Sequence, residues 1–302
     1  MARFDHLKGV FGLLPTPYRD DLEIHIPDLR AAADFCCRSG QHGIVWPVMV
    51  GEFYFLGEQE RIRGLHEVME ASDGRLPLIF GCSGVSVPQV LYFAAEAQKA
   101  GADAVIAMTP ARTDTATALE MYKRMAEVFH GPLVVQNADA YAPLSGEQIA
   151  QLVEDVPSIE YIKEERQPGP KHIAEVHRLV GHKIKTIFGG AAGKVLPDEY
   201  LRGANGCMPA CEIADLLAQV MELLWAGDEE GARELHRRLL PLIILETHPF
   251  MRYILKRRGV FTSTVERAPA GKQALDADDR REITRLIRAI EKDVQSYSFG
   301  EE

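Results

Sequence analysis

The segment PLVVQNADAYAPLSGEQIAQLVEDVPSIEYIK, residues 132–163, contains two apolar runs separated by a helix-like stretch. The runs at 132–137 and 159–163 are continuous rather than alternating, as expected of strands that are buried on both faces. Between them, Ser145 and Gln148 have the spacing of a helix capping box, which places a helix over 145–155. The segment therefore predicts a strand–helix–strand unit of a parallel sheet.

The same pattern repeats along the first two thirds of the chain. Apolar runs occur at 9–14, 43–47, 77–81, 104–109, 132–137, 159–163, 185–189 and 206–209. Helix-like segments lie between them at 26–39, 58–72, 87–100, 116–130, 145–155, 169–180 and 193–202. This alternation predicts the α/β class and a (β/α)8 TIM barrel. A doubly wound sheet is the alternative, but it would place a glycine-rich turn where the sequence reads LLPTPYRDD.

Beyond residue 209 the strand pattern ends. Helical patterns follow at 213–226, 229–246, 249–258 and 277–294. We therefore expect a barrel over residues 1–225 and a C-terminal helical extension over 226–302, packed on the barrel.

Composition limits the classes of partner. The chain has 302 residues and a net charge of -10, which argues against a broad nucleic-acid or anionic-membrane surface. The five cysteines are odd in number and form no CxxC pair, and the start MARFDHLKGV lacks a signal-peptide core, so we expect a cytoplasmic protein. Because Cys207 and Cys211 have no second pair at zinc-type spacing, we expect neither a metal nor a cofactor.

Lys163 ends the sixth predicted strand, and alternation puts it on one face with Ile159 and Tyr161. Catalytic groups of (β/α)8 barrels lie at this end of the strands, where a partly desolvated amine can form a Schiff base with a ketone. The alternative is an ion pair with Glu164 or Glu165. A strand that continued through Glu165 would place its carboxylate on the lysine's face, and we expect the backbone to turn away there.

Several motifs occur in a fixed order around these strands: Pro15-Thr16-Pro17, Gly51-Glu52-Phe53-Tyr54, Met108-Thr109-Pro110, Ile162-Lys163-Glu164-Glu165 and Phe188-Gly189-Gly190. With them, the chain resembles the family of dihydrodipicolinate synthase and N-acetylneuraminate lyase over about residues 8–294. These are class I, Schiff-base-forming barrels that act on 2-keto acids. The resemblance implies that Lys163 forms the Schiff base, that the partner is a small 2-keto acid, and that the protein is a homotetramer.

The sequence departs from the family pattern at several places, and two of them bear directly on the chemistry. Where the family usually has GTTGE or GSTGE, whose hydroxyls bind the keto-acid carboxylate, the chain has Val48-Met49-Val50-Gly51-Glu52. Where the family usually has a general acid/base tyrosine, it has Gln136. We therefore expect a water held by Gln136, Tyr141 or the substrate's own carboxylate to take part in proton transfer. We do not expect dihydrodipicolinate synthesis itself.

The candidate substrate-binding residues come from different strands of the predicted barrel. Arg112 is expected to clamp a carboxylate, Gly189 to allow close approach of the backbone, and Thr16 to line the pocket floor. A surface arginine and a simple tight turn are the alternatives for the first two. The full candidate set is Thr16, Met49, Val50, Arg112, Gly189 and Met208.

The leading hypothesis is a lyase that cleaves or dehydrates a substrate like a 2-keto-3-deoxy sugar acid through an imine at Lys163. A second hypothesis is a non-catalytic, ligand-binding barrel that has lost its proton relay. A third, a phosphate-binding isomerase, rests only on Gly189, Gly190 and Gly193.

Overall fold

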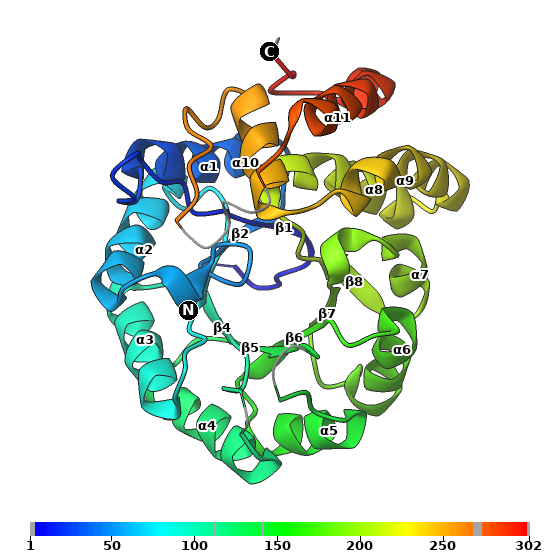
Figure 1. The fold of residues 1–302 in the computed structure, drawn as a ribbon. Coiled ribbons are helices and arrows are strands. Elements are labelled where there is room, and N and C mark those ends of the chain that lie inside the picture. Colours follow the sequence, from blue (N-terminus) through cyan, green and yellow to red (C-terminus); the bar gives the residue numbers. More distant parts are fainter. Residues whose placement is uncertain (1–3, 112, 140–141, 268–273, 301–302) are drawn as a thin grey trace.

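The computed structural model describes residues 4–111, 113–139, 142–267 and 274–300. Eight parallel strands pair in sequence order and close into a barrel, with helices around it (Figure 1). The predicted (β/α)8 barrel is therefore confirmed. No helix in these described ranges is long and apolar enough to cross a membrane.

The eight strands match the eight predicted apolar runs. They are β1 Gly9–Leu13, β2 Gly43–Trp46, β3 Leu78–Gly81, β4 Ala104–Ala107, β5 Leu133–Asn137, β6 Ile159–Glu164, β7 Thr186–Gly189 and β8 Ala204–Cys207. All their residues are buried except Glu160 and Asn205, which are intermediate. This two-sided burial explains why the strands read as continuous apolar runs.

The helices of the barrel also lie where helical patterns were predicted. They are α1 Ile26–Arg38, α2 Glu58–Ser72, α3 Val87–Ala100, α4 Thr115–Val128, α5 Gly146–Asp155, α6 Gly169–Val180, α7 Leu196–Leu201 and α8 Ala214–Trp225. The predicted capping box begins α5: the Ser145 hydroxyl accepts from the Gln148 amide, and the Gln148 side chain accepts from the Ser145 amide. Helix α7 begins three residues later than predicted because Gly193, with φ 75, and Val195, with φ -128 and ψ 23, are not in the α-helical conformation.

Three further helices follow the barrel: α9 Glu229–Ile244, α10 His248–Arg257 and α11 Ala277–Ile290. They share an apolar core with α8 and lie together at one side of the barrel (Figure 1). The Thr247 hydroxyl accepts from the Phe250 amide and caps α10, so the chain between α9 and α10 turns at 245–247. The predicted division at residue 225 coincides with the end of α8, and the domain assignment itself stays a prediction.

Packed side chains fill the barrel interior. Phe11 and Phe188 meet edge to face, with ring centroids 5.2 Å apart, and the Tyr161 hydroxyl accepts from the Leu7 amide. Val45, Ile79, Ile106 and Val134 belong to the same buried cluster. Because this cluster fills the inside of the strands, space for a ligand remains at their carboxyl ends.

Candidate active site at the carboxyl ends of the strands

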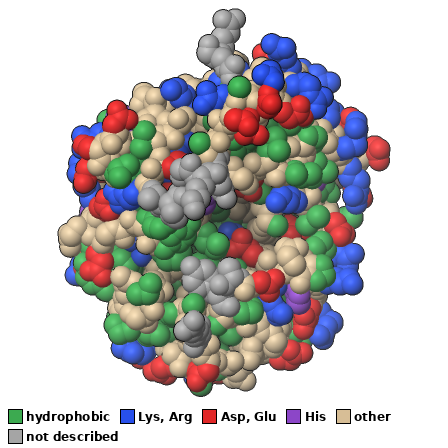
Figure 2. Space-filling view, in the orientation of Figure 1, with side chains coloured by type: hydrophobic (Ala, Val, Ile, Leu, Met, Phe, Trp, Pro, Cys, Tyr) green, Lys and Arg blue, Asp and Glu red, His purple; other side chains and the backbone are tan. Residues whose placement is uncertain are grey.

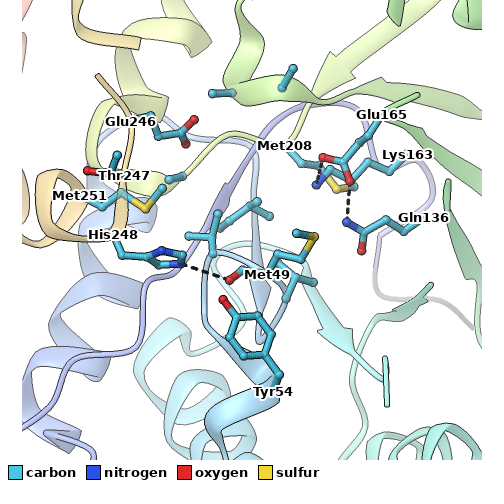
Figure 3. Close-up of a pocket in the computed structure, with 16 residues that line it drawn as sticks. Met49, Tyr54, Gln136, Lys163, Glu165, Met208, Glu246, Thr247, His248 and Met251 are labelled. Carbon is cyan, nitrogen blue, oxygen red and sulfur yellow. Dashed lines mark hydrogen bonds and ion pairs between the residues drawn. The ribbon is translucent and has the colours of Figure 1, made fainter. Parts of the chain in front are cut away.

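A pocket of about 400 Å³ opens at the carboxyl ends of the strands. Figure 2 shows the hollow at the centre of this face, with hydrophobic side chains and a few charged ones inside it. Lys163, Gln136 and Glu165 lie on one side of the pocket, and Glu246 and His248 lie on the other (Figure 3).

Lys163 is the fifth residue of β6, beside Gln136 on β5 and Phe188 on β7. Only 2% of the residue is exposed, and it lines the pocket as predicted. Its Nζ forms an ion pair with Glu165 Oε1 at 2.9 Å. The second carboxylate oxygen, Oε2, accepts a hydrogen bond of 2.6 Å from Gln136 Nε2. Glu165 therefore bridges the lysine and the glutamine (Figure 3).

Our expectation that the backbone turns away at Glu165 is wrong. The Glu165 amide donates to the Asn137 carbonyl at 2.8 Å, so strand pairing continues beyond β6 and places the carboxylate on the lysine's face. The Glu164 side chain points to the opposite face of the strand. Its carboxylate accepts hydrogen bonds from Asn137 Nδ2 at 2.8 Å and from the Arg166 amide at 2.9 Å. Burial raises the pKa of Glu164 to about 7.

The turn after β7 leaves room for Glu165. A Cβ on Gly190 would lie 2.8 Å from Glu165 Oε1 and closer still to its Cγ, so a larger residue would displace the carboxylate. Gly189 does not contribute to the described pocket lining; its missing side chain accommodates Glu199 of α7 instead. Burial raises the pKa of Glu199 to about 8. Because the side chains of Glu165 and Glu199 already occupy the space beside Gly190 and Gly189, this turn is a poor phosphate site, which argues against the isomerase hypothesis.

The second-strand side of the pocket is apolar, as the sequence predicts. Met49 and Val50 line it, and Met208 lines the pocket after β8. Thr16 is fully buried and is absent from the described lining: its hydroxyl donates to the Gly51 carbonyl at 2.6 Å and accepts from Trp46 Nε1 at 3.1 Å. The hydroxyl thus fixes the loop after β2.

Two candidates, Arg112 and Tyr141, lie outside the described residues. Their proposed roles, the carboxylate clamp and the replacement phenol, therefore stay predictions.

The whole chain can also be compared with known proteins. A model of the dihydrodipicolinate synthetase family matches residues 6–290. The chain belongs to the dihydrodipicolinate synthetase family. This confirms the family resemblance inferred from the strand-end motifs.

Two relatives with named activities show the range of the dihydrodipicolinate synthetase family. L-2-keto-3-deoxyarabonate dehydratase of Azospirillum brasilense is 26% identical over 294 residues, which is 94% of each chain. A 4-hydroxy-tetrahydrodipicolinate synthase of Marinobacter nauticus is 29% identical over 265 residues, covering 84% of this chain and 89% of the relative. The family thus includes lyases with different substrates.

Solved structures of the family have the same fold. Dihydrodipicolinate synthase from Rhodopseudomonas palustris superposes with a TM-score of 0.85 at 24% identity, over 93% of this chain and 97% of that one. YagE from E. coli K12, solved in complex with pyruvate, superposes with a TM-score of 0.84 at 22% identity, over the same two shares.

The wall opposite Lys163 was not found from the sequence. It consists of Glu246 and Thr247 from the turn between α9 and α10, His248 and Met251 from α10, and Tyr54. His248 Nε2 lies 3.4 Å from the Met49 carbonyl oxygen (Figure 3). Burial raises the pKa of Glu246 to about 7, although Lys194 and Lys163 oppose the shift. This family member therefore has a polar far wall supplied by its helical extension.

Acidic side chains outnumber lysines and arginines in the described lining of the pocket. Among its described lining residues, Lys163 is the only lysine or arginine, whereas Glu165 and Glu246 are both acids. The amide oxygen of Gln136 is buried and has no hydrogen-bond partner among the described residues. The lining therefore offers several acceptors for ligand hydroxyls. In the described parts of the chain, no cluster of three or more His, Cys, Asp or Glu residues could hold a metal.

Proposed function

We propose that this protein is a lyase that forms a Schiff base between Lys163 and the ketone of a 2-keto acid. The observation that carries the proposal is the position of the Lys163 amine, buried at the carboxyl end of β6 and facing the pocket. Lysine forms imines with ketones readily, and carboxyl ends of strands are where barrels of this class place reacting groups.

The chemistry of the imine determines the reaction class. A protonated imine at C2 accepts the electron pair released when a proton or a carbon–carbon bond at the adjacent position is broken. Loss of water from the next carbon and retro-aldol cleavage both proceed through this nitrogen. The proposal therefore includes dehydration and cleavage as the two possible outcomes.

A substrate like a 2-keto-3-deoxy sugar acid fits the lining best. Its hydroxyls would donate to the acceptors of the pocket, namely the Gln136 amide oxygen, Glu165 and Glu246. The name of the Azospirillum brasilense relative, a keto-deoxy sugar-acid dehydratase, supports the same class. Pyruvate has no hydroxyl group for these acceptors, and it meets the apolar Met49 and Val50 where the family usually has hydroxyls. We also propose that the protein is cytoplasmic and that it forms a homotetramer. A monomer by light scattering at micromolar concentration would contradict the tetramer.

The non-catalytic alternative rests on one observation, the glutamine at the position where the family usually has its tyrosine. Turnover separates the two hypotheses. A panel of 2-keto-3-deoxy pentonates and hexonates should show a released 2-keto acid or a dehydrated product, and Lys163→Ala should remove this activity.

Lys185→Ala is the matched control, because Lys185 directly precedes β7, at the opposite end of the barrel from the pocket, and pairs with Glu160 at 2.7 Å. Its activity should equal that of the wild type. Absence of turnover across the panel, together with unchanged ligand binding in Lys163→Ala, would favour the binding barrel.

A further inference from the structure

We infer that Glu165 is the proton carrier of this site and that Gln136 and Gly190 are its positioning residues. The inference rests on the proposed imine at Lys163 and names the group that moves protons to and from it. No motif of the sequence predicted this role, because we expected Glu165 to point away from the lysine.

The distances meet the requirement for proton transfer. Glu165 Oε1 lies 2.9 Å from Lys163 Nζ, within direct reach of the nitrogen that becomes the imine. Glu165 Oε2 accepts from Gln136 Nε2 at 2.6 Å, which fixes the plane of the carboxylate. A glutamine amide cannot serve as a general base, so Gln136 orients the carboxylate and Glu165 carries the proton.

The burial of the Lys163–Glu165 pair differs from that of ion pairs that support the fold. In the structural pair of Arg258 with Asp215, the side chains are 0% and 3% exposed, and Arg258 also donates to the Glu212 carbonyl. In the Lys163–Glu165 pair the lysine is 3% exposed, but the glutamate is 19% exposed and lines the pocket. The carboxylate is therefore accessible to a bound ligand.

The β7 turn also fits this role. Gly190 has φ -121, so it is not in the left-handed conformation that favours glycine. The space beside it is occupied by the Glu165 side chain. The absence of a side chain at residue 190 thus allows the carboxylate to reach both Lys163 and Gln136.

Proton transfer through Glu165 balances at each step. The carboxylate takes a proton from the Lys163 ammonium, and the neutral nitrogen then attacks C2, so that the C–N bond forms and the carbonyl pair moves to oxygen. Glu165 relays a proton from nitrogen to this oxygen and then gives its own proton to the hydroxyl as the C–O bond breaks and water leaves. A protonated imine and the Glu165 carboxylate remain. The carboxylate next removes a C3 proton, and the C–H pair forms the enamine double bond while the imine pair returns to nitrogen.

Exchange of C3 protons tests this role without knowledge of the natural substrate. The probe is 2-oxobutanoate in D₂O, followed by proton NMR, with Lys163→Ala as the background. Wild type should exchange the C3 protons, and Glu165→Gln should lower the rate by about 100- to 10,000-fold. In Glu165→Ala, added formate should raise the exchange rate at least tenfold, because the small acid can occupy the space that the glutamate side chain leaves. Chloride, an anion that cannot carry a proton at neutral pH, should restore none of the rate, which separates a proton carrier from a structural counter-ion.

Glu160→Gln is the matched control, since Glu160 is also on β6 and pairs with a lysine, Lys185, away from the pocket. Its exchange rate should equal that of wild type, and thermal unfolding should show that all variants are folded. Exchange in Glu165→Gln within threefold of wild type, or a loss in Glu165→Ala that formate does not restore, would overturn the role of Glu165. Absence of exchange and of borohydride adduct in wild type would instead overturn the imine proposal.

Discussion

Gly190→Ala should move the Glu165 carboxylate without removing it, and so tests whether the position of this carboxylate matters for the reaction. The added methyl group would lie 2.8 Å from Glu165 Oε1, and nearer to Cγ, whereas ordinary contacts begin near 3.4 Å. The carboxylate must therefore move by roughly 1 Å, which lengthens its 2.9 Å contact with Lys163 Nζ beyond hydrogen-bond distance. Misplacement by about 1 Å of a catalytic group can lower a rate by around 100-fold.

The assay is the saturating rate of C3-proton exchange from 2-oxobutanoate. We expect Gly190→Ala to lower this rate by about 100-fold while the concentration at half saturation changes little, because the pocket still admits the ligand. Gly57→Ala is a suitable control: Gly57 has φ -65, and its added Cβ would have its nearest neighbour at 3.5 Å. A Gly190→Ala protein that is folded and exchanges within threefold of wild type would refute this argument about position.

Two other results are expected. Glu199 has a pKa of about 8 in the folded protein and 4.5 as its ordinary value, so the folded state holds the extra proton and stability should fall as pH rises from about 4.5 to 8. Glu199→Gln should remove this loss and raise the free energy of unfolding at pH 9, by up to about 5 kcal/mol, in urea titrations at pH 5 and pH 9; an equal effect at both pH values would contradict the burial of an uncharged carboxyl. Condensation of pyruvate with aspartate semialdehyde should be undetectable, because Gln136 stands where the family usually has its tyrosine and because Met49 and Val50 remove two hydrogen bonds worth roughly 0.5–1.5 kcal/mol each. Robust condensation would refute this interpretation of the two departures.

The barrel could be predicted because each strand is buried on both faces. Such strands leave continuous apolar runs, and the helices between them have caps such as Ser145 that the sequence shows directly. The start of α7 was predicted three residues too early, because Gly193, with φ 75, and Val195, with ψ 23, are not helical, which the helical pattern of the segment does not indicate.

The candidate site was only partly predictable. Lys163 could be predicted as a site residue because it lies at the end of a strand. Glu165 could have been predicted by the same alternation if the sixth strand had been extended by two residues, since the backbone pairing continues to Glu165. Thr16 was predicted to line the pocket floor, but its hydroxyl forms hydrogen bonds with the Gly51 carbonyl and with Trp46 Nε1 instead.

The far wall could not be inferred from local pattern. Glu246 lies at the end of a predicted helix, more than 80 positions from Lys163 in the sequence, and only the path of the chain after α9 brings both residues to one pocket. Its contribution arises from tertiary packing of the extension on the barrel.

The central claim is that Lys163 forms an imine, and peptide mapping after borohydride reduction tests it most directly. The protein is incubated with 2-oxobutanoate, reduced, digested and examined by tandem mass spectrometry. We predict one adduct per chain, on the peptide that contains Lys163, and no adduct in Lys163→Ala. An adduct on Lys185 or Lys194, or no adduct with a broad panel of 2-keto acids, would contradict the account.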